Sequence, residues 1–276
     1  MSDELELIGL VALGFAVGTY GTIIGLGGGF ILVPVLLLLY PEYDPEQLTA
    51  ISLAVVWANT TSGAIAYGRQ GRIDYVTGSI FALSSAPGVL AGVFLVGLIP
   101  EGTFSIILAL FLLALAALAI RGPPRVIRPP LTGRGVVVRS LVTPEGVYRY
   151  GYRLWQAILL SMGVGLVSSL FGIGGGAIYV PAMISILHFP VQFAVATSTY
   201  ILAFVSGGAT AVHLATGTLS GDQLAKAVAL GAGAVAGAQA GAQLARRMRP
   251  GMVVKLLVTA LLLLAGRLLL KGLTGA

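Results

Sequence analysis

Residues 25–34 read Gly-Leu-Gly-Gly-Gly-Phe-Ile-Leu-Val-Pro, and residues 172–181 read Gly-Ile-Gly-Gly-Gly-Ala-Ile-Tyr-Val-Pro. The two segments lie 147 positions apart, and apolar sequence surrounds both. Glycine is about 1 kcal/mol less favourable than alanine inside a helix, so three consecutive glycines indicate a break in a helix. Close packing of two helices is the alternative reading, but packing glycines are spaced along one face rather than consecutive. The repeated stretch therefore predicts two broken helices.

Composition places both breaks in a membrane. Hydrophobic residues make up 57% of the chain and charged residues 9%, and the mean hydropathy is +0.97. A soluble domain is about half apolar and about a quarter charged, so the chain is predicted to be a polytopic membrane protein. At membrane depth, non-helical backbone is tolerated only where protein or a water-filled cavity surrounds it. Two breaks therefore indicate an internal site, where the N–H groups at the start of each second arm suit an anion.

The residues disfavour several classes of function. Both glycine clusters lack the third glycine of a dinucleotide fingerprint, because Phe30 and Ala177 occupy its place. Cysteine is absent, the histidines His188 and His213 have no metal-ligand spacing, and no Asp or Glu lies inside an apolar span. We therefore expect no enzyme, no catalytic residue, no metal and no cofactor. The net charge of +6 comes from basic loops that set membrane topology, so no nucleic-acid partner is expected.

The second half of the chain repeats the first at single residues. The matched pairs, at offsets of 146 to 149 positions, are Gly18/Gly165, Gly25/Gly172, Pro34/Pro181, Ser52/Ser198, Tyr67/His213, Gly71/Gly217, Gly88/Gly237 and Gly92/Gly241. Such a duplication is typical of transporters built from two structural repeats. We divide the chain into a first transmembrane repeat (1–120), a basic linker (121–153) and a second transmembrane repeat (154–276).

The linker 121–153 contains seven arginines, five prolines and a single acidic residue. Within it, the runs 136–142 and 147–152 flank the turn sequence Thr-Pro-Glu-Gly, which predicts a small β-hairpin. An excess of arginine is typical of cytoplasmic loops, so the linker is predicted to lie in the cytoplasm.

The segment from Leu5 to Tyr40 is too long for one straight crossing, because its 36 residues would form a helix of about 54 Å against a hydrocarbon core of about 30 Å. It either crosses once with an unwound middle or folds at the glycines into a hairpin. Hairpins leave three further crossings in each half, and an odd number inverts the second repeat relative to the first. With the linker inside, the hairpin arrangement also places the arginines of 246–249 inside, whereas a single crossing leaves them outside.

Hairpins are therefore favoured, although Lys226 and the basic C-terminal end, near Arg267 and Lys271, then fall on the outer side with the acidic loop 42–46. The predicted fold is an all-α polytopic membrane protein of two inverted repeats. Each repeat consists of a glycine-broken helical hairpin and three transmembrane helices.

The residues around both clusters resemble the TauE/SafE group of sulfite exporters and related permeases. The resemblance is carried by residues 25–34 and 171–181, by Ala196-Thr197-Ser198, and by the pairs Ser62-Gly63 and Ser206-Gly207. It covers nearly the whole chain. It implies an inner-membrane permease for small sulfur-containing anions such as sulfite, thiosulfate or organosulfonates. The long insertion 121–153 looks unusual within this family, which leaves open a regulatory or partner-binding role for the linker.

We predict that the anion is held by backbone amides at the starts of the broken helices and by hydroxyl groups at the interface between the repeats. The candidate substrate-binding residues are Gly27, Gly28, Gly29, Phe30, Ser52, Thr61, Gly174, Gly175, Gly176, Ala177, Ser198 and Ser206. Serine and threonine in membrane helices often bond their own backbone, so each hydroxyl also has a structural interpretation. His213 is expected to be an interfacial residue, with a proton carrier as the alternative.

The predicted function is a secondary transporter in the inner membrane, with a small anion and the lipid bilayer as its partners. A channel for anions or small solutes is the alternative function. The coupling ion, the direction of transport and the oligomeric state stay open, so proton coupling and oligomer formation are both compatible with the sequence.

Overall fold

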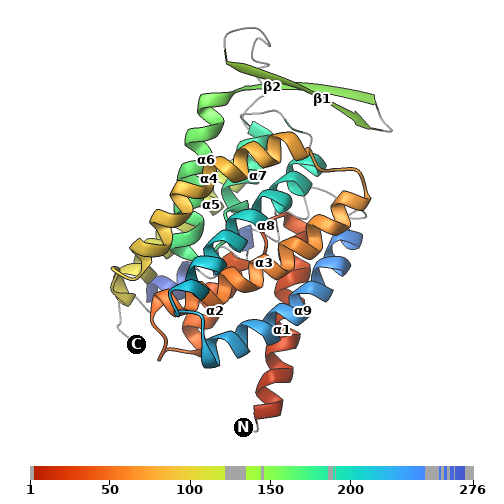
Figure 1. The fold of residues 1–276 in the computed structure, drawn as a ribbon. Coiled ribbons are helices and arrows are strands. Elements are labelled where there is room, and N and C mark those ends of the chain that lie inside the picture. Colours follow the sequence, from red (N-terminus) through yellow and green to blue (C-terminus); the bar gives the residue numbers. More distant parts are fainter. Residues whose placement is uncertain are drawn as a thin grey trace.

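The computed structural model describes residues 3–121, 135–143, 146–185, 189, 191–245, 255, 258–259, 262–263 and 265–270. Its elements are α1 (Asp3–Ile24), α2 (Gly29–Leu39), α3 (Pro45–Arg69), α4 (Tyr75–Val96), α5 (Glu101–Arg121), β1 (Val136–Thr143), β2 (Gly146–Arg153), α6 (Leu154–Phe171), α7 (Gly176–Ser185), α8 (Val191–Ala215) and α9 (Gly221–Ala245) (Figure 1). Among the described residues, α1, α3, α4, α6, α8 and α9 are long and apolar enough to cross a membrane. The predicted all-α polytopic membrane protein is confirmed. The last of the three transmembrane helices predicted for the second repeat falls within 252–270, which lies largely outside the described residues.

Each glycine cluster breaks a helix and turns the chain back. The first break separates α1 from the short α2, and the hydroxyl of Tyr40, just after α2, donates to the Glu6 carboxylate near the start of α1 at 2.8 Å. Both arms of the first hairpin therefore end on the same side of the molecule. The second break separates α6 from α7. The start of α6 directly follows β2, and Phe189, after α7, packs on Tyr150 of β2 with ring centroids 4.1 Å apart.

The two hairpins open toward opposite ends of the molecule, α1–α2 toward the end that carries the N-terminus and α6–α7 toward the β-strands (Figure 1). The predicted hairpin arrangement is thus present in both halves. Whether the halves are inverted copies throughout stays a prediction, because the last crossing of the second half lies largely outside the described residues.

The long helices pack in pairs, α1 along α9, α4 along α6, and α3 along α8. Glycines make the first two pairs close. A Cβ added at Gly233 or Gly237 of α9 would overlap backbone carbonyls of α1, and one added at Gly88 or Gly92 of α4 would overlap or press on those of α6. The predicted four-residue spacing of these glycines therefore places helix backbones in direct contact, as small residues do between membrane helices.

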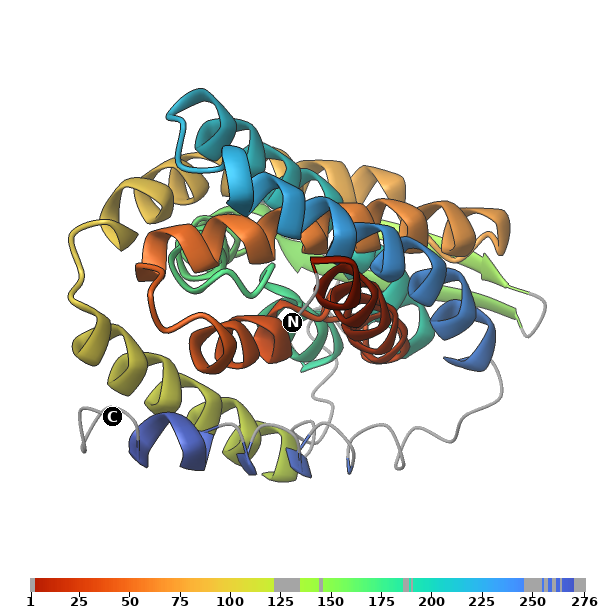
Figure 2. The same cartoon turned by 90° about the horizontal axis from the view of Figure 1, so that it is seen from below.

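Helix α5 lies at the edge of the bundle, beside the described helical turns of 265–270 (Figure 2). This aliphatic helix is exposed on one face only. Phe104, Leu108 and Leu112 are fully buried, whereas Ile107 and Leu110 on the other face are exposed. The buried face packs on Phe171 at the end of α6, whose ring lies 5.7 Å from that of Phe104.

Strands β1 and β2 form an antiparallel hairpin, with Val136 opposite Arg153 and Thr143 opposite Gly146. This hairpin falls where the sequence predicts one, while the rest of the linker, 122–134, lies outside the described residues. The hairpin lies across one end of the helical bundle (Figure 1).

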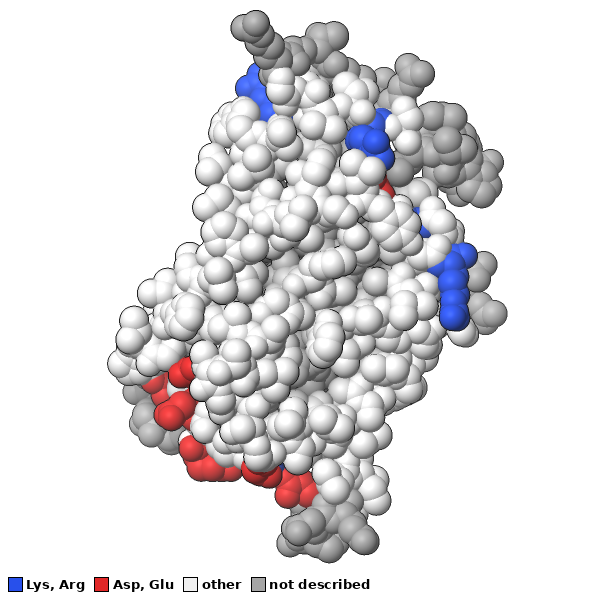
Figure 3. All heavy atoms as spheres, viewed as in Figure 1, with Lys and Arg blue, Asp and Glu red and all other residues white. Residues whose placement is uncertain are grey.

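On the face shown in Figure 3, acidic side chains gather at one end of the molecule, basic side chains lie toward the other, and the surface between them is uncharged. We call the end that carries Glu42, Asp44, Glu46 and Asp222 the acidic end. The opposite end, which carries the β-hairpin together with Arg69, Arg72, Arg139 and Arg153, is called the basic end. The uncharged middle between the ends is the part that a hydrocarbon core can surround.

Candidate functional site

The two glycine clusters touch one another through their backbones. A Cβ added to Gly29 would overlap the carbonyl oxygen of Gly172, and a Cβ added to Gly176 would overlap the carbonyl oxygen of Gly25. The two contacts are equivalent, because each pair of partners exchanges under the offset of 147 positions. Only glycine allows two chain segments to approach this closely.

One serine from the opposite half of the chain is hydrogen-bonded to each cluster. The Ser52 hydroxyl on α3 donates to the Gly172 carbonyl at 2.7 Å, and the Ser198 hydroxyl on α8 donates to the Gly25 carbonyl at 3.3 Å. Both serines are fully buried. Their hydroxyl hydrogens are therefore used between the halves in this conformation.

Val56 of α3 and Leu202 of α8 cover the meeting point of the clusters. Cβ atoms added at Gly27 and Gly174 would both lie within 3.4 Å of atoms of these two side chains. Residues 21–30 and 171–177 are buried throughout. This conformation is consequently closed around the clusters.

The starts of α2 and α7 supply backbone amides without acceptors. Gly28 and Gly175, with φ of 85° and 81°, adopt the left-handed conformation just before each helix begins. Within the described part of the chain, no acceptor is recorded for the amides of Gly28, Gly29 and Phe30, nor for those of 174–177. Such amides lie at the positive end of a helix dipole and provide donors to an anion.

The structure brings most of the predicted site residues together. Gly27–Phe30, Gly174–Ala177, Ser52 and Ser198 meet at the two breaks. Ser206 lies one turn beyond Leu202 and donates to the Leu202 carbonyl of its own helix. Its hydroxyl therefore has the structural role that serines in membrane helices often have, a bond to their own backbone.

Thr61 is separated from the clusters. Its neighbour Thr60 packs toward Gly27, whereas Thr61 is exposed on the adjacent face of α3. There it lines a groove of about 600 Å³ between α3 and α8, whose other lining residues include Trp57, Tyr200 and Phe204. The groove is hollowed into the uncharged middle of the surface in Figure 3.

A chain of polar contacts around the first cluster was not predicted. The Asn59 side-chain amide donates to the Gly27 carbonyl at 3.1 Å and accepts a bond from the Thr22 hydroxyl at 3.1 Å. The Tyr67 hydroxyl donates to the Thr22 carbonyl at 3.0 Å. Asn59 opens the polar run 59–62 in an otherwise apolar span, and that run is the signal that could have identified it.

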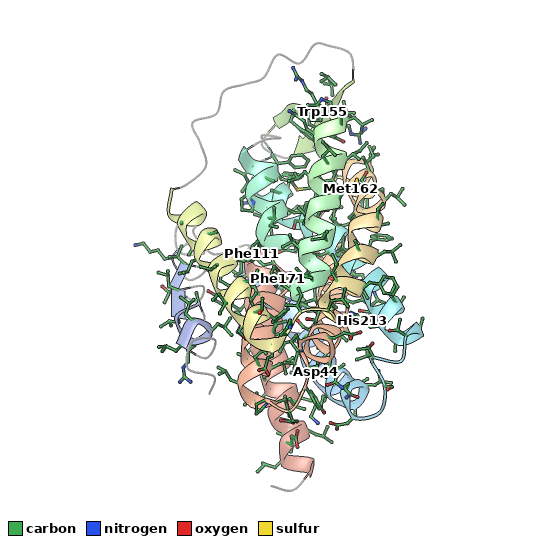
Figure 4. The ribbon with its side chains drawn as sticks, turned by 90° about the vertical axis from the view of Figure 1, so that its left-hand side faces the viewer. Asp44, Phe111, Trp155, Met162, Phe171 and His213 are labelled. Carbon is green, nitrogen blue, oxygen red and sulfur yellow. The ribbon has the colours of Figure 1, made fainter. Side chains whose placement is uncertain are left out.

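His213, which matches Tyr67 in the second half, is not an interfacial residue. Its side chain is fully buried in the last turn of α8, and neither ring nitrogen has a hydrogen-bond partner among the described residues. Figure 4 shows it toward the end of the molecule that carries Asp44, away from Trp155. The expectation of an interfacial side chain is wrong, because the ring of His213 is buried although Leu214 and Ala215 beside it are exposed.

Asp74 is a second buried ionisable residue, at the basic end. Its carboxylate accepts bonds from the Thr77 backbone amide, the Thr77 hydroxyl and the Tyr150 hydroxyl of β2. Arg139 of β1 lies 3.4 Å away and forms an ion pair with it. Burial raises the pKa of the nearby Tyr152 hydroxyl above its ordinary value. The sequence signal for Asp74 is that of a helix N-cap, an acidic residue three positions before Thr77.

The Asp74 network ties the β-hairpin to the bundle. The Asp74 backbone amide also donates to the Thr197 hydroxyl at 3.0 Å, and Thr197 precedes the serine that holds Gly25. Within the described residues, no group of three or more His, Cys, Asp or Glu side chains could hold a metal ion.

Comparisons with known proteins agree on one family. The family profile described as sulfite exporter TauE/SafE matches residues 10–268. The chain is 31% identical to the probable membrane transporter protein YunE of Bacillus subtilis, over 97% of this chain and 99% of that protein. It is 25% identical to a probable membrane transporter protein of Methanocaldococcus jannaschii, over 76% and 73% of the two chains. No solved structure matches the chain. Its described part contains six helices long and apolar enough to cross a membrane and the paired glycine breaks, and the protein belongs to the sulfite exporter TauE/SafE family of membrane transporters.

Proposed function

We propose that this transporter carries small sulfur-containing oxyanions, such as sulfite, thiosulfate or organosulfonates, as a secondary transporter. The family description names sulfite, and the observation that carries the proposal is the meeting of two helix starts with unpaired amides at a buried point. A compact oxyanion offers several acceptor oxygens to such donors. No lysine or arginine is needed at the point where the clusters meet.

Neutral donors suit a carrier that has to release its cargo. A hydrogen bond from an amide to a charged oxygen contributes about 1.5 to 3 kcal/mol, so a few amides hold an anion with moderate affinity. The anion cannot enter the closed conformation, and one half has to move relative to the other. When the halves part, the hydroxyls of Ser52 and Ser198 leave their carbonyl partners and become donors to the anion.

We further propose that the halves are inverted repeats that open alternately toward the two ends. This is supported by hairpins that open in opposite directions and by the equivalent contacts of Gly25 with Gly176 and of Gly172 with Gly29. Chain boundaries near 120 and 153 then separate the repeats from the linker. In an inner membrane, the basic end faces the cytoplasm under the positive-inside rule.

Lys226 does not oppose this orientation, although it lies at the acidic end. Its ammonium group forms ion pairs with Asp222 and, at 3.8 Å, with Glu6. It also lies 4.9 Å from the centre of the Tyr40 ring. Two carboxylates and an aromatic ring offset its charge locally, so it adds little to the basic signal that retains a loop inside.

Flux measured in proteoliposomes tests the proposed substrate class. Vesicles loaded with unlabelled thiosulfate are expected to accumulate labelled thiosulfate, and sulfite or methanesulfonate in excess should compete with it. Phosphate and chloride serve as the matched anions that should compete weakly. A channel would let the label equilibrate without the unlabelled anion inside, and a protein that moves none of the sulfur anions would contradict the proposal.

A cysteine tests the proposed orientation. The chain contains no native cysteine, and Ser140 in β1 is exposed, so Ser140→Cys provides a single accessible thiol. A membrane-impermeant maleimide should leave it unlabelled in intact cells and label it after the cells are opened. Labelling in intact cells would show that the basic end faces outward and would contradict the proposed orientation.

A further inference from the structure

His213 occupies the place in the second half that Tyr67 occupies in the first, 146 positions earlier. Both side chains are buried, but their bonding differs. The Tyr67 hydroxyl is bonded to the Thr22 carbonyl, whereas both ring nitrogens of His213 lack a partner among the described residues. One imidazole nitrogen is always a donor and the other an acceptor or donor, so an enclosed ring without partners is unfavourable. The ring is therefore more stable in a conformation that gives its nitrogens water or protein partners.

Among the described residues, one charged group acts electrostatically on the His213 ring, and it is Glu46 in the first turn of α3. Helices α4, α6 and α7 also pack against α8, and their sequences contain no acidic or basic residue. Glu46 itself accepts a bond from the Thr218 hydroxyl in the turn between α8 and α9, at 2.9 Å. The carboxylate thus joins the start of α3 to the chain just beyond His213.

His213 lies where the turn between α8 and α9 is joined to the start of α3 at the acidic end. The His213 carbonyl accepts a bond from the Leu219 amide at 3.1 Å, so hydrogen bonds join the backbone of His213, the following turn and Glu46. Charging an enclosed ring without partners is unfavourable, and so proton binding favours a conformation in which the ring reaches water and Glu46 offsets its charge. A ligand that binds one conformation better shifts the population toward it.

We infer that His213 is the proton-binding residue of the transport cycle, and that a proton from solution at the acidic end, taken up by its imidazole, opens that end of the protein. The inference rests on the proposed anion transport and adds a proton that controls the opening of the acidic end. The proton returns to solution when the ring is enclosed again. Tyr67 cannot act in the same way, because a phenol does not titrate near neutral pH and this one is already bonded.

The test compares anion exchange at equal pH on both sides of proteoliposomes, from pH 8 to pH 5.5. Exchange of labelled for unlabelled thiosulfate by the unmodified protein should rise by roughly tenfold as the pH falls, since the protonated fraction of a histidine changes by up to about tenfold per pH unit. His213→Gln keeps a polar side chain of similar size and should make exchange independent of pH. His188→Gln, at the other histidine of the sequence, is the matched control and should keep the pH dependence.

A pH-independent exchange by the unmodified protein, or an unchanged pH dependence in His213→Gln, would overturn the inference. If the protein transports none of thiosulfate, sulfite and methanesulfonate, the proposed function fails, and the proton site is then tested by direct titration of His213. The protein is labelled with ¹⁵N-histidine in lipid nanodiscs, and the signal missing from folded His213→Gln is assigned to His213. Protonation of that signal between pH 5 and 8 supports the proton site, and its absence overturns the site whatever the substrate is.

Discussion

The two halves share the glycine breaks but hold them differently. Around the first break, Asn59 bonds the Gly27 carbonyl and Thr22 bonds Asn59. At the equivalent places in the second half stand Val205 and Ser169. Valine cannot bond the Gly174 carbonyl, and the hydroxyl of Ser169 has no partner among the described residues. The first break is therefore fixed by side chains of its own half, and the second is not.

This difference indicates which half moves. An element with buried polar groups that lack partners is less stable locally than one whose groups are paired. Both halves contain such groups among the described residues, and those of the first half are Thr19, Thr49, Gln70 and Ser105. In the second half, Ser168 and Ser169 lie in the last turn of α6, directly before the break, and both nitrogens of His213 lie near the end of α8. We expect the α6–α7 break and the end of α8 to rearrange during transport, while the α1–α2 break stays as the fixed side of the anion site.

Replacing the last left-handed glycine of either cluster should have the largest effect. In Gly28→Val and Gly175→Val, the new side chain would meet Val17 or Val164 at under 3 Å and would strain a backbone with φ above 80°. Thiosulfate exchange should fall to background in both. Gly163→Ala, where an added Cβ meets nothing within 4 Å, should exchange at the normal rate. Normal exchange in both cluster variants, with normal amounts of folded protein, would make the clusters packing elements.

Exchanging the side chains that distinguish the halves is the next largest change. Asn59→Val gives the first half the residue of the second and leaves the Gly27 carbonyl and Thr22 hydroxyl unpaired, at a cost of about 1 to 3 kcal/mol. We expect a lower unfolding temperature in detergent and slower exchange. Val205→Asn gives the second half an amide that can bond the Gly174 carbonyl, and it should raise the unfolding temperature but slow exchange. Faster exchange in Val205→Asn would contradict the assignment of the second half as the moving one.

The sequence was sufficient to predict the two breaks and their common internal site. It was not sufficient to predict which side of a helix faces that site, or which loop residues are buried by distant segments. Consecutive glycines are a local signal for a break, and the positions of the arginines favoured hairpins over single crossings. Thr60 and Thr61 are neighbours about 100° apart around α3, and a helix that is apolar nearly all round gives no indication which of them faces the clusters. Asp74 reads as a loop residue, and only the β-hairpin 76 positions later buries it.

The serines that cross between the halves should have unequal effects. Ser52 bonds Gly172 at 2.7 Å and Ser198 bonds Gly25 at 3.3 Å, so each alanine variant loses one buried hydrogen bond, worth about 0.5 to 1.5 kcal/mol. Ser52→Ala should lower the unfolding temperature more than Ser198→Ala does. Both should weaken thiosulfate binding if the freed hydroxyls become donors to the anion, and unchanged binding would restrict these serines to holding the halves together. Ser220→Ala, at an exposed hydroxyl in the α8–α9 turn, is the control.

The smallest effect is expected at the ion pair that joins the linker to the bundle. The Arg139 side chain is 35% exposed and lies 3.4 Å from Asp74, so solvent screens much of the attraction, and such pairs contribute at most about 1 kcal/mol. Arg139→Ala leaves the bonds from Thr77 and Tyr150 in place, and it should alter the unfolding temperature only slightly. Asp74→Ala removes the carboxylate that accepts bonds from the Thr77 amide, the Thr77 hydroxyl and the Tyr150 hydroxyl, and it should destabilise the protein clearly more, because three buried donors lose a charged acceptor. Comparable losses in the two variants would mean that Arg139, rather than the buried hydrogen bonds, holds the linker hairpin against the basic end.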